Sequence, residues 1–70
     1  MKKYLVVVEK GDTIYGAYVP DLPGCVAVGE TADEVENLIK ESIAMHIEAM
    51  HEDGEVIPEP ISFPLSVAVP

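Results

Sequence analysis

The sequence contains no arginine and no tryptophan, and its four lysines are opposed by thirteen Asp and Glu residues, giving a formal net charge of −9. Proteins bind nucleic acids mainly through Lys and Arg contacts to phosphates, with about one counterion released per contact. The composition therefore argues against nucleic-acid binding by this chain. It favours a basic protein partner, or simply a well-solvated acidic surface.

A single cysteine, Cys25, excludes an internal disulfide. Apolar residues make up 49% of the 70 residues, too many for a disordered chain. A chain of this length buries only roughly 60% of its unfolded surface, and such domains commonly rely on disulfides, metals or oligomerisation. We therefore expect one folded domain, residues 1–70, that gains stability by self-association.

Long hydrophobic runs are also missing. The apolar run near the start extends only from Tyr4 to Val8 and is ended by Glu9. A secretory signal needs about 7–15 apolar residues and a membrane span about 20. We expect a cytoplasmic protein, and a reduced thiol fits that compartment.

What the sequence does contain is four apolar stretches with strand character, at residues 3–9, 13–19, 25–29 and 61–69. Between the third and fourth stretches, an apolar stripe with helical spacing predicts a helix at 32–52. Thr31 and Glu34 form a capping-box pattern at its start, and Gly54 is a typical residue to end it. Pro64 lacks an amide donor and places the last strand at a sheet edge or a bulge.

This order, β-β-β-α-β, predicts an α+β fold. The first three strands form an antiparallel meander, and a right-handed crossover through the helix places the fourth strand beside the first, in the spatial order 3-2-1-4. One helix covers one face, yet the strands are apolar on both faces. We expect a homo-oligomer, a dimer or higher, that buries the free face. The fourth strand either stays in its own subunit or is exchanged with a neighbour.

Catalytic patterns are weak. Cys25 would need an activating histidine, and His46 lies about 20 Å along the helix from its start. With the helix expected to begin near the Cys25 loop and run away from it, we interpret Cys25 as a packing residue. His46 and His51 are five residues apart and do not share a helical face as the histidines of a zinc-binding HExxH motif do. We interpret them as partly exposed helix residues.

The element order is that of the front half of a ribonuclease-H-like fold, which would need acids on neighbouring strands to hold two metal ions. The first strand has only Glu9 at its end, the fourth has no acid, and Glu36, Glu41 and Glu48 lie off the apolar stripe. No phosphate-binding loop or dinucleotide fingerprint is present. We predict no catalytic residue, no metal and no cofactor.

Residues 18–60, YVPDLPGCVAVGETADEVENLIKESIAMHIEAMHEDGEVIPEP, closely resemble the HicB-like antitoxin family. The matching features are the PDLPGC-type loop, the GET-type start of the helix, the amphipathic helix and the Gly-x-x-Ile-Pro-x-Pro stretch, and the resemblance covers about residues 3–63. It implies a partial ribonuclease-H-like fold without nuclease activity. It also implies a type II toxin–antitoxin partner, a small basic HicA-like toxin that cleaves mRNA and whose active site the antitoxin covers.

Many members of that family carry a C-terminal DNA-binding domain, whereas this sequence ends at Pro70 without a basic segment. We therefore do not expect this chain to bind a promoter, as the members with that domain do. The alternative is an orphan oligomeric HicB-like module that binds another protein or a small ligand.

For a toxin partner, charge and expected exposure predict an acidic contact surface around the third strand and the helix start. Its predicted members are Asp21, Leu22, Glu30, Glu34 and Glu36.

Overall fold

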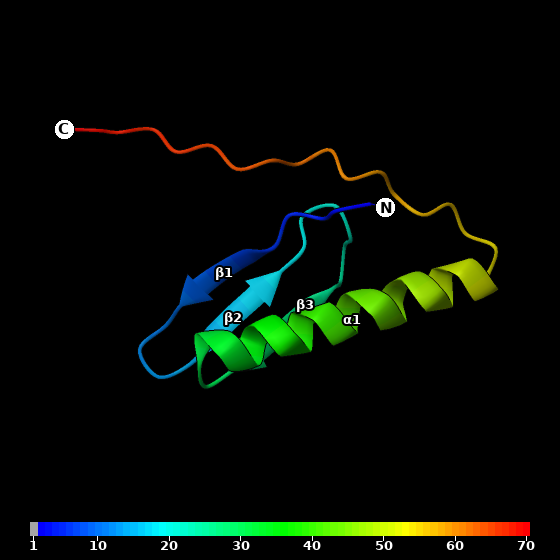
Figure 1. Cartoon of the computed structure of the whole chain (residues 1–70), viewed down its shortest axis with the longest axis horizontal. Helices are drawn as coiled ribbons and strands as arrows, with labels where there is room; N and C mark the ends of the chain where they lie inside the picture. Colours follow the sequence, from blue (N-terminus) through cyan, green and yellow to red (C-terminus); the bar gives the residue numbers. More distant parts are fainter. Residues whose placement is uncertain (1) are drawn as a thin grey trace.

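The computed structural model describes residues 2–70 and consists of a three-stranded sheet followed by one helix. Figure 1 shows the helix packed along one face of the sheet and an extended chain that leaves the end of the helix. This arrangement confirms the predicted α+β class with an antiparallel meander. The elements are β1 (Val7–Lys10), β2 (Tyr15–Tyr18), β3 (Val26–Gly29) and α1 (Ala32–Glu52).

The strands pair in the order β1-β2-β3, and both pairs are antiparallel. Tyr18 lies opposite Val7 on one side and Val26 on the other. The first strand is shorter than predicted, because ladder pairing starts only at Val7 although the apolar run starts at Tyr4.

The helix has the predicted limits, and both of its ends are fixed locally. The Thr31 side chain accepts a hydrogen bond of 3.0 Å from the Glu34 amide, which satisfies one otherwise free donor. At the other end Gly54 adopts a φ of +70°, and the amides of Gly54 and Glu55 donate to the carbonyls of His51 and Met50. This pairing is a Schellman motif, which favours glycine at the left-handed position.

The core lies between the sheet and α1. Its fully buried residues come from β2, from the β2–β3 loop and from the inner face of the helix: Ala17, Val19, Leu22, Cys25, Val35 and Ile39. The opposite face of the sheet is covered by no helix of residues 2–70 and exposes Tyr18, Val26 and Val28. The strands are thus apolar on both faces, as the sequence predicted, and one face is open in the single chain.

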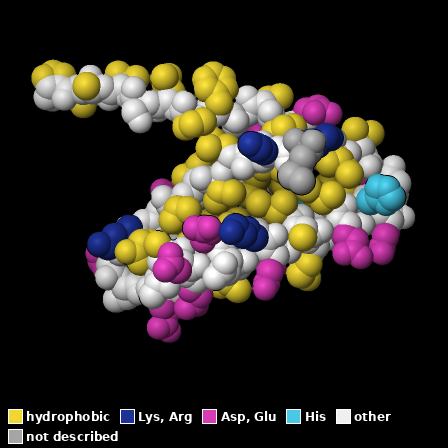
Figure 2. All heavy atoms as spheres, in the orientation of Figure 1, with side chains coloured by type: hydrophobic (Ala, Val, Ile, Leu, Met, Phe, Trp, Pro, Cys, Tyr) yellow, Lys and Arg dark blue, Asp and Glu magenta, His cyan; other side chains and the backbone are white. Residues whose placement is uncertain are grey.

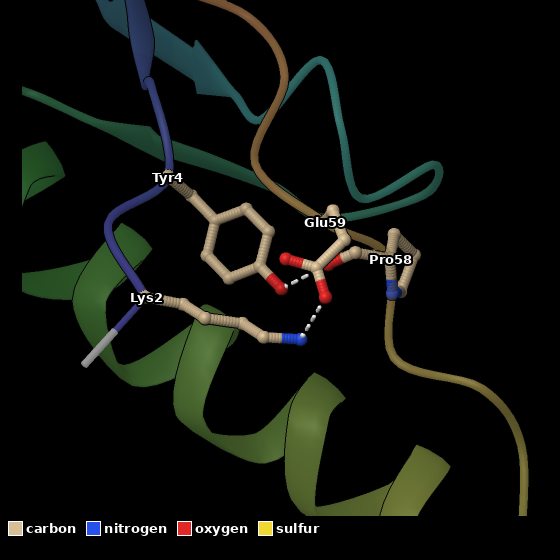
Figure 3. Close-up of polar contacts among 4 residues, drawn as sticks. All are labelled: Lys2, Tyr4, Pro58 and Glu59. Atoms are coloured by element: carbon tan, nitrogen blue, oxygen red, sulfur yellow. Dashed lines mark hydrogen bonds and ion pairs between the residues drawn. The ribbon is translucent and has the colours of Figure 1, made fainter.

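The predicted fourth strand at 61–69 is wrong, and so is the order 3-2-1-4, because the described residues form no fourth strand. This segment is extended and pairs with no strand in the part of the chain that the structure describes. The chain before it is held at the beginning of the sheet, where the Tyr4 hydroxyl donates to the Pro58 carbonyl and Lys2 forms an ion pair of 3.2 Å with Glu59 (Figure 3). From there the chain turns away from β1 instead of running beside it (Figure 1).

Within residues 2–70, no helix is both long enough and apolar enough to cross a membrane.

Candidate partner-binding surface

The β2–β3 loop, residues 19–25, is a compact turn that buries the side chains of Leu22 and Cys25. Three backbone hydrogen bonds of 3.0–3.2 Å link Val19, Leu22 and Cys25 into a compact turn. Gly24 has a φ of +85°, a conformation that favours glycine. The turn directs Leu22 into the core, where it is 0% exposed. The prediction that Leu22 belongs to an exposed contact surface is therefore corrected: its side chain is a core residue.

Asp21, in the same loop, is half-buried and already engaged within the chain. Its Oδ2 accepts a hydrogen bond from the Ser62 amide and its Oδ1 one from the Ser62 hydroxyl, both at 2.9 Å. Hydrogen bonds to a carboxylate are stronger than neutral ones. Asp21 therefore ties the chain after α1 to the β2–β3 loop, a role that no local pattern indicated, because Ser62 lies 41 residues further along.

The other predicted residues, Glu30, Glu34 and Glu36, are exposed at the start of α1. We call these three the acidic rim. The junction before the helix is tight: a Cβ on Gly29 would lie 3.1 Å from the Val35 amide nitrogen and 3.3 Å from the Glu34 side chain. This close approach turns the chain from β3 directly into α1 and brings Glu30 next to the first helical turn.

The structure separates the acidic rim from Asp21. Tyr18 at the end of β2 pairs with Val26 at the start of β3, so Asp21 lies at that end of the sheet. Glu30 follows the opposite end of β3, about 13 Å away along a four-residue strand. Glu36 also forms an ion pair of 3.1 Å with Lys40, in which both side chains are well exposed. The four predicted carboxylates thus form one rim of three and one distant carboxylate that is bonded within the chain.

Cys25 is a buried free thiol, which confirms its interpretation as a packing residue. The reason given from the sequence was wrong, however. The helix does not run away from the Cys25 loop: because β3 leads away from Cys25 and α1 returns along it, the Cys25 Sγ lies 3.4 Å from the Ser42 Oγ in the middle of α1.

His46 lies one turn beyond Ser42 and, with Leu38, Glu41 and Met45, lines a shallow hollow of about 390 Å³. With the thiol only 1% exposed beneath the helix, Cys25 does not reach solvent there. Across the part of the chain that the structure describes, no group of three or more His, Cys, Asp and Glu residues is placed to hold a metal ion.

Basic residues gather elsewhere. Lys2, Lys3 and Lys40 line a second hollow of about 470 Å³ together with Tyr4 and Ile43, between the beginning of the chain and α1. Figure 2 shows acidic side chains distributed along the edge formed by α1. Charge is therefore unevenly distributed over the surface, with the acidic rim at the start of α1 and three of the four lysines beside the middle of the helix.

Comparison with known proteins gives a family match. Residues 4–70 match the family model described as HicB_like antitoxin of bacterial toxin–antitoxin system. A UPF0150 protein of Archaeoglobus fulgidus is 40% identical over 58 residues, which cover 79% of this chain and 84% of that protein. A UPF0150 protein of Synechocystis is 36% identical over 69 residues, covering 94% of this chain and 87% of that protein.

An uncharacterised 14.9 kDa protein from the rep-hol intergenic region of Haemophilus phage HP1 is 43% identical over 56 residues. The match covers 80% of this chain but spans only 42% of the phage protein. No solved structure matches the chain.

Proposed function

Because the chain belongs to the HicB-like antitoxin family of bacterial toxin–antitoxin systems, we propose that it neutralises a small basic ribonuclease of the HicA type by covering the active site of that toxin. The observation that carries the proposal is the family match over residues 4–70, nearly the whole chain. Members of this family are typically non-catalytic, and we propose the same for this chain, acting in the cytoplasm.

Electrostatics supports this proposal. A ribonuclease attracts phosphate through basic side chains, and the same field attracts a domain with a net charge of −9. Complementary charge raises the association rate well above that of neutral partners and lets the antitoxin compete with RNA for the same surface. Among the residues predicted for contact, the acidic rim meets this requirement, because its three carboxylates are exposed.

The second candidate retains the fold without a toxin: an orphan module whose apolar sheet face binds another protein. The exposed side chains of Tyr18, Val26 and Val28 favour it. A small ligand is less well supported, because both hollows are shallow and open to solvent.

Co-expression separates the two candidates. A short basic protein encoded beside this chain is expressed alone and together with it. The toxin hypothesis predicts growth arrest by the neighbour alone, rescue by this chain and co-purification of the two proteins. If this chain gives neither rescue nor a complex, the proposed function is refuted and the orphan module remains.

The acidic rim is tested by association kinetics with two double variants that change the net charge equally, from −9 to −5. The rim variant is Glu30→Lys with Glu36→Lys, and the control is Glu48→Lys with Glu55→Lys, at exposed positions elsewhere. We expect the rim variant to associate about tenfold more slowly than the control at low salt, with the difference shrinking as salt is raised. Equal rates for both variants would move the contact surface away from the rim.

A further inference from the structure

Residues 61–69, which we call the arm, have the sequence pattern of a strand but pair with no strand among residues 2–70. Apolar side chains occupy every second position, and all five are 74–81% exposed. Strict alternation is typical of a strand with one buried face. Figure 2 shows these hydrophobic side chains along the extended chain, outside the packed body. They are Ile61, Phe63, Leu65, Val67 and Val69.

The path of the chain explains why the arm does not join its own sheet. Tyr4 lies three residues before β1, and Asp21 lies three residues after the end of β2. If the pairing of Val7 with Tyr18 were continued by three residues, Tyr4 and Asp21 would lie opposite each other. The contacts of Pro58 with Tyr4 and of Ser62 with Asp21 therefore carry the chain across this end of the sheet. Beyond Ser62 the arm points outward (Figure 1). The radius of gyration, 13.5 Å, exceeds the value of about 11 Å for a compact chain of this length.

The first strand of the sheet, β1, has an edge with which the arm could pair. This strand is at the end of the order β1-β2-β3, so one of its edges has no strand beside it among residues 2–70. The helix packs mainly on β3 and β2. As a result Val8, which lies opposite the buried Ala17, remains 48% exposed. The hollow lined by Tyr4 and Ile43 lies beside the beginning of the same strand.

The prolines leave one edge of the arm intact. In a strand, the amide and carbonyl of successive residues point to opposite edges, and a proline removes a donor from one of them. Pro64 and Pro70 are both at even positions, as is Ser62, whose amide already binds Asp21. Every odd residue from 61 to 69 keeps its N–H. The arm can therefore pair through its odd residues without losing a hydrogen bond.

We propose that the arm of one copy adds to the free β1 edge of a second copy, pairing through its odd-numbered residues, and that the second copy returns its own arm in the same way. The apolar side chains of the arm then cover Val8 and the hollow at Tyr4 and Ile43 in the partner. The chain dimerises by reciprocal strand addition, and each sheet gains the fourth strand that its own chain does not supply.

A second copy suits the arm better than an unrelated protein. The chain carries both an arm that can be donated and a β1 edge that can accept one. In a two-fold symmetric dimer, each arm therefore pairs with the β1 edge of the other copy. Residues 60–70 contain no charged side chain, so the arm can approach a copy of equal negative charge, and three lysines line the hollow beside the acceptor strand. The inference does not depend on a toxin.

The first test is the mass of the protein in solution by light scattering during size-exclusion chromatography. The wild-type chain is expected to be a dimer, and Leu65→Asp a monomer with an unchanged helical circular-dichroism signal. The dissociation constant should rise about 100-fold or more, because a charge is placed on the buried face. The matched control, Ser66→Asp, adds the same charge on the other face and should remain a dimer.

A pair of proline variants tests the pairing edge itself. Val67→Pro removes an N–H from the odd edge and should dissociate the dimer, whereas Ala68→Pro removes one from the even edge and should not. A monomeric wild-type chain would overturn the proposal, and so would a dimer unaffected by Leu65→Asp. If the wild-type chain is monomeric and Leu65→Asp instead abolishes a toxin complex, the arm binds the toxin, and the second copy is refuted while the proposed function stands.

Discussion

Leu22→Ala distinguishes a contact residue from a core residue in the β2–β3 loop. Leu22 is 0% exposed and belongs to the core formed with α1 and β2. Replacing a buried leucine by alanine costs about 2–5 kcal/mol, depending on how far the cavity collapses. A domain of 70 residues has roughly 3–10 kcal/mol of total stability. We therefore expect a loss of about 3 kcal/mol, which lowers the melting temperature by about 12–24 °C.

The assay is urea and thermal unfolding followed by circular dichroism at 222 nm. Met45→Ala is the control, because it shortens a helix side chain that is 69% exposed and should change stability by less than about 0.5 kcal/mol. If Leu22→Ala were as stable as Met45→Ala but failed to bind a partner, Leu22 would be a contact residue, and the burial described above would be refuted.

Two further predictions concern the backbone and the tie between loop and arm. Gly54→Ala should lower the free energy of unfolding by about 1 kcal/mol, measured by thermal unfolding, because Gly54 has a φ of +70°. The control is Gly16→Ala, which should lower it clearly less, because Gly16 has an ordinary φ and no atom lies within 4 Å of the added Cβ. Equal losses of stability in the two variants would contradict the capping role of Gly54. Asp21→Ala should speed amide hydrogen exchange at Ser62 about tenfold or more, because the carboxylate that accepts this amide is removed. Asp12→Ala, at an exposed turn, should leave the exchange at Ser62 unchanged, and a similar rate in both variants would show that Asp21 does not hold the arm.

The parts of the fold predicted correctly are those that neighbouring residues determine. The helix limits follow from Thr31 at one end and Gly54 at the other, both of which act through hydrogen bonds to residues at most five positions away. The meander likewise follows from short apolar stretches joined by short turns. The strand predicted at 61–69 does not form within residues 2–70, because a strand requires a partner edge and an apolar stretch does not say which chain supplies that edge.

The errors arise from contacts between distant residues. The contact of Asp21 with Ser62 was not foreseen, because Ser62 lies 41 residues further along, and the predicted role of Asp21 in partner contact stays a prediction. Leu22 was placed on the surface because it lies in a loop, although the turn at Val19 and Cys25 directs it inward. The location of Cys25 beside Ser42 follows from the return of α1 along β3, a matter of topology that spacing along the helix could not provide.

The proposed antitoxin activity is tested most directly by titrating the ribonuclease activity of the purified basic neighbour with this chain. We expect cleavage of an RNA substrate to fall to background at a stoichiometric ratio, and inhibition to weaken with increasing salt, because the chain carries a net charge of −9. Full ribonuclease activity at a several-fold excess of this chain would contradict this proposal.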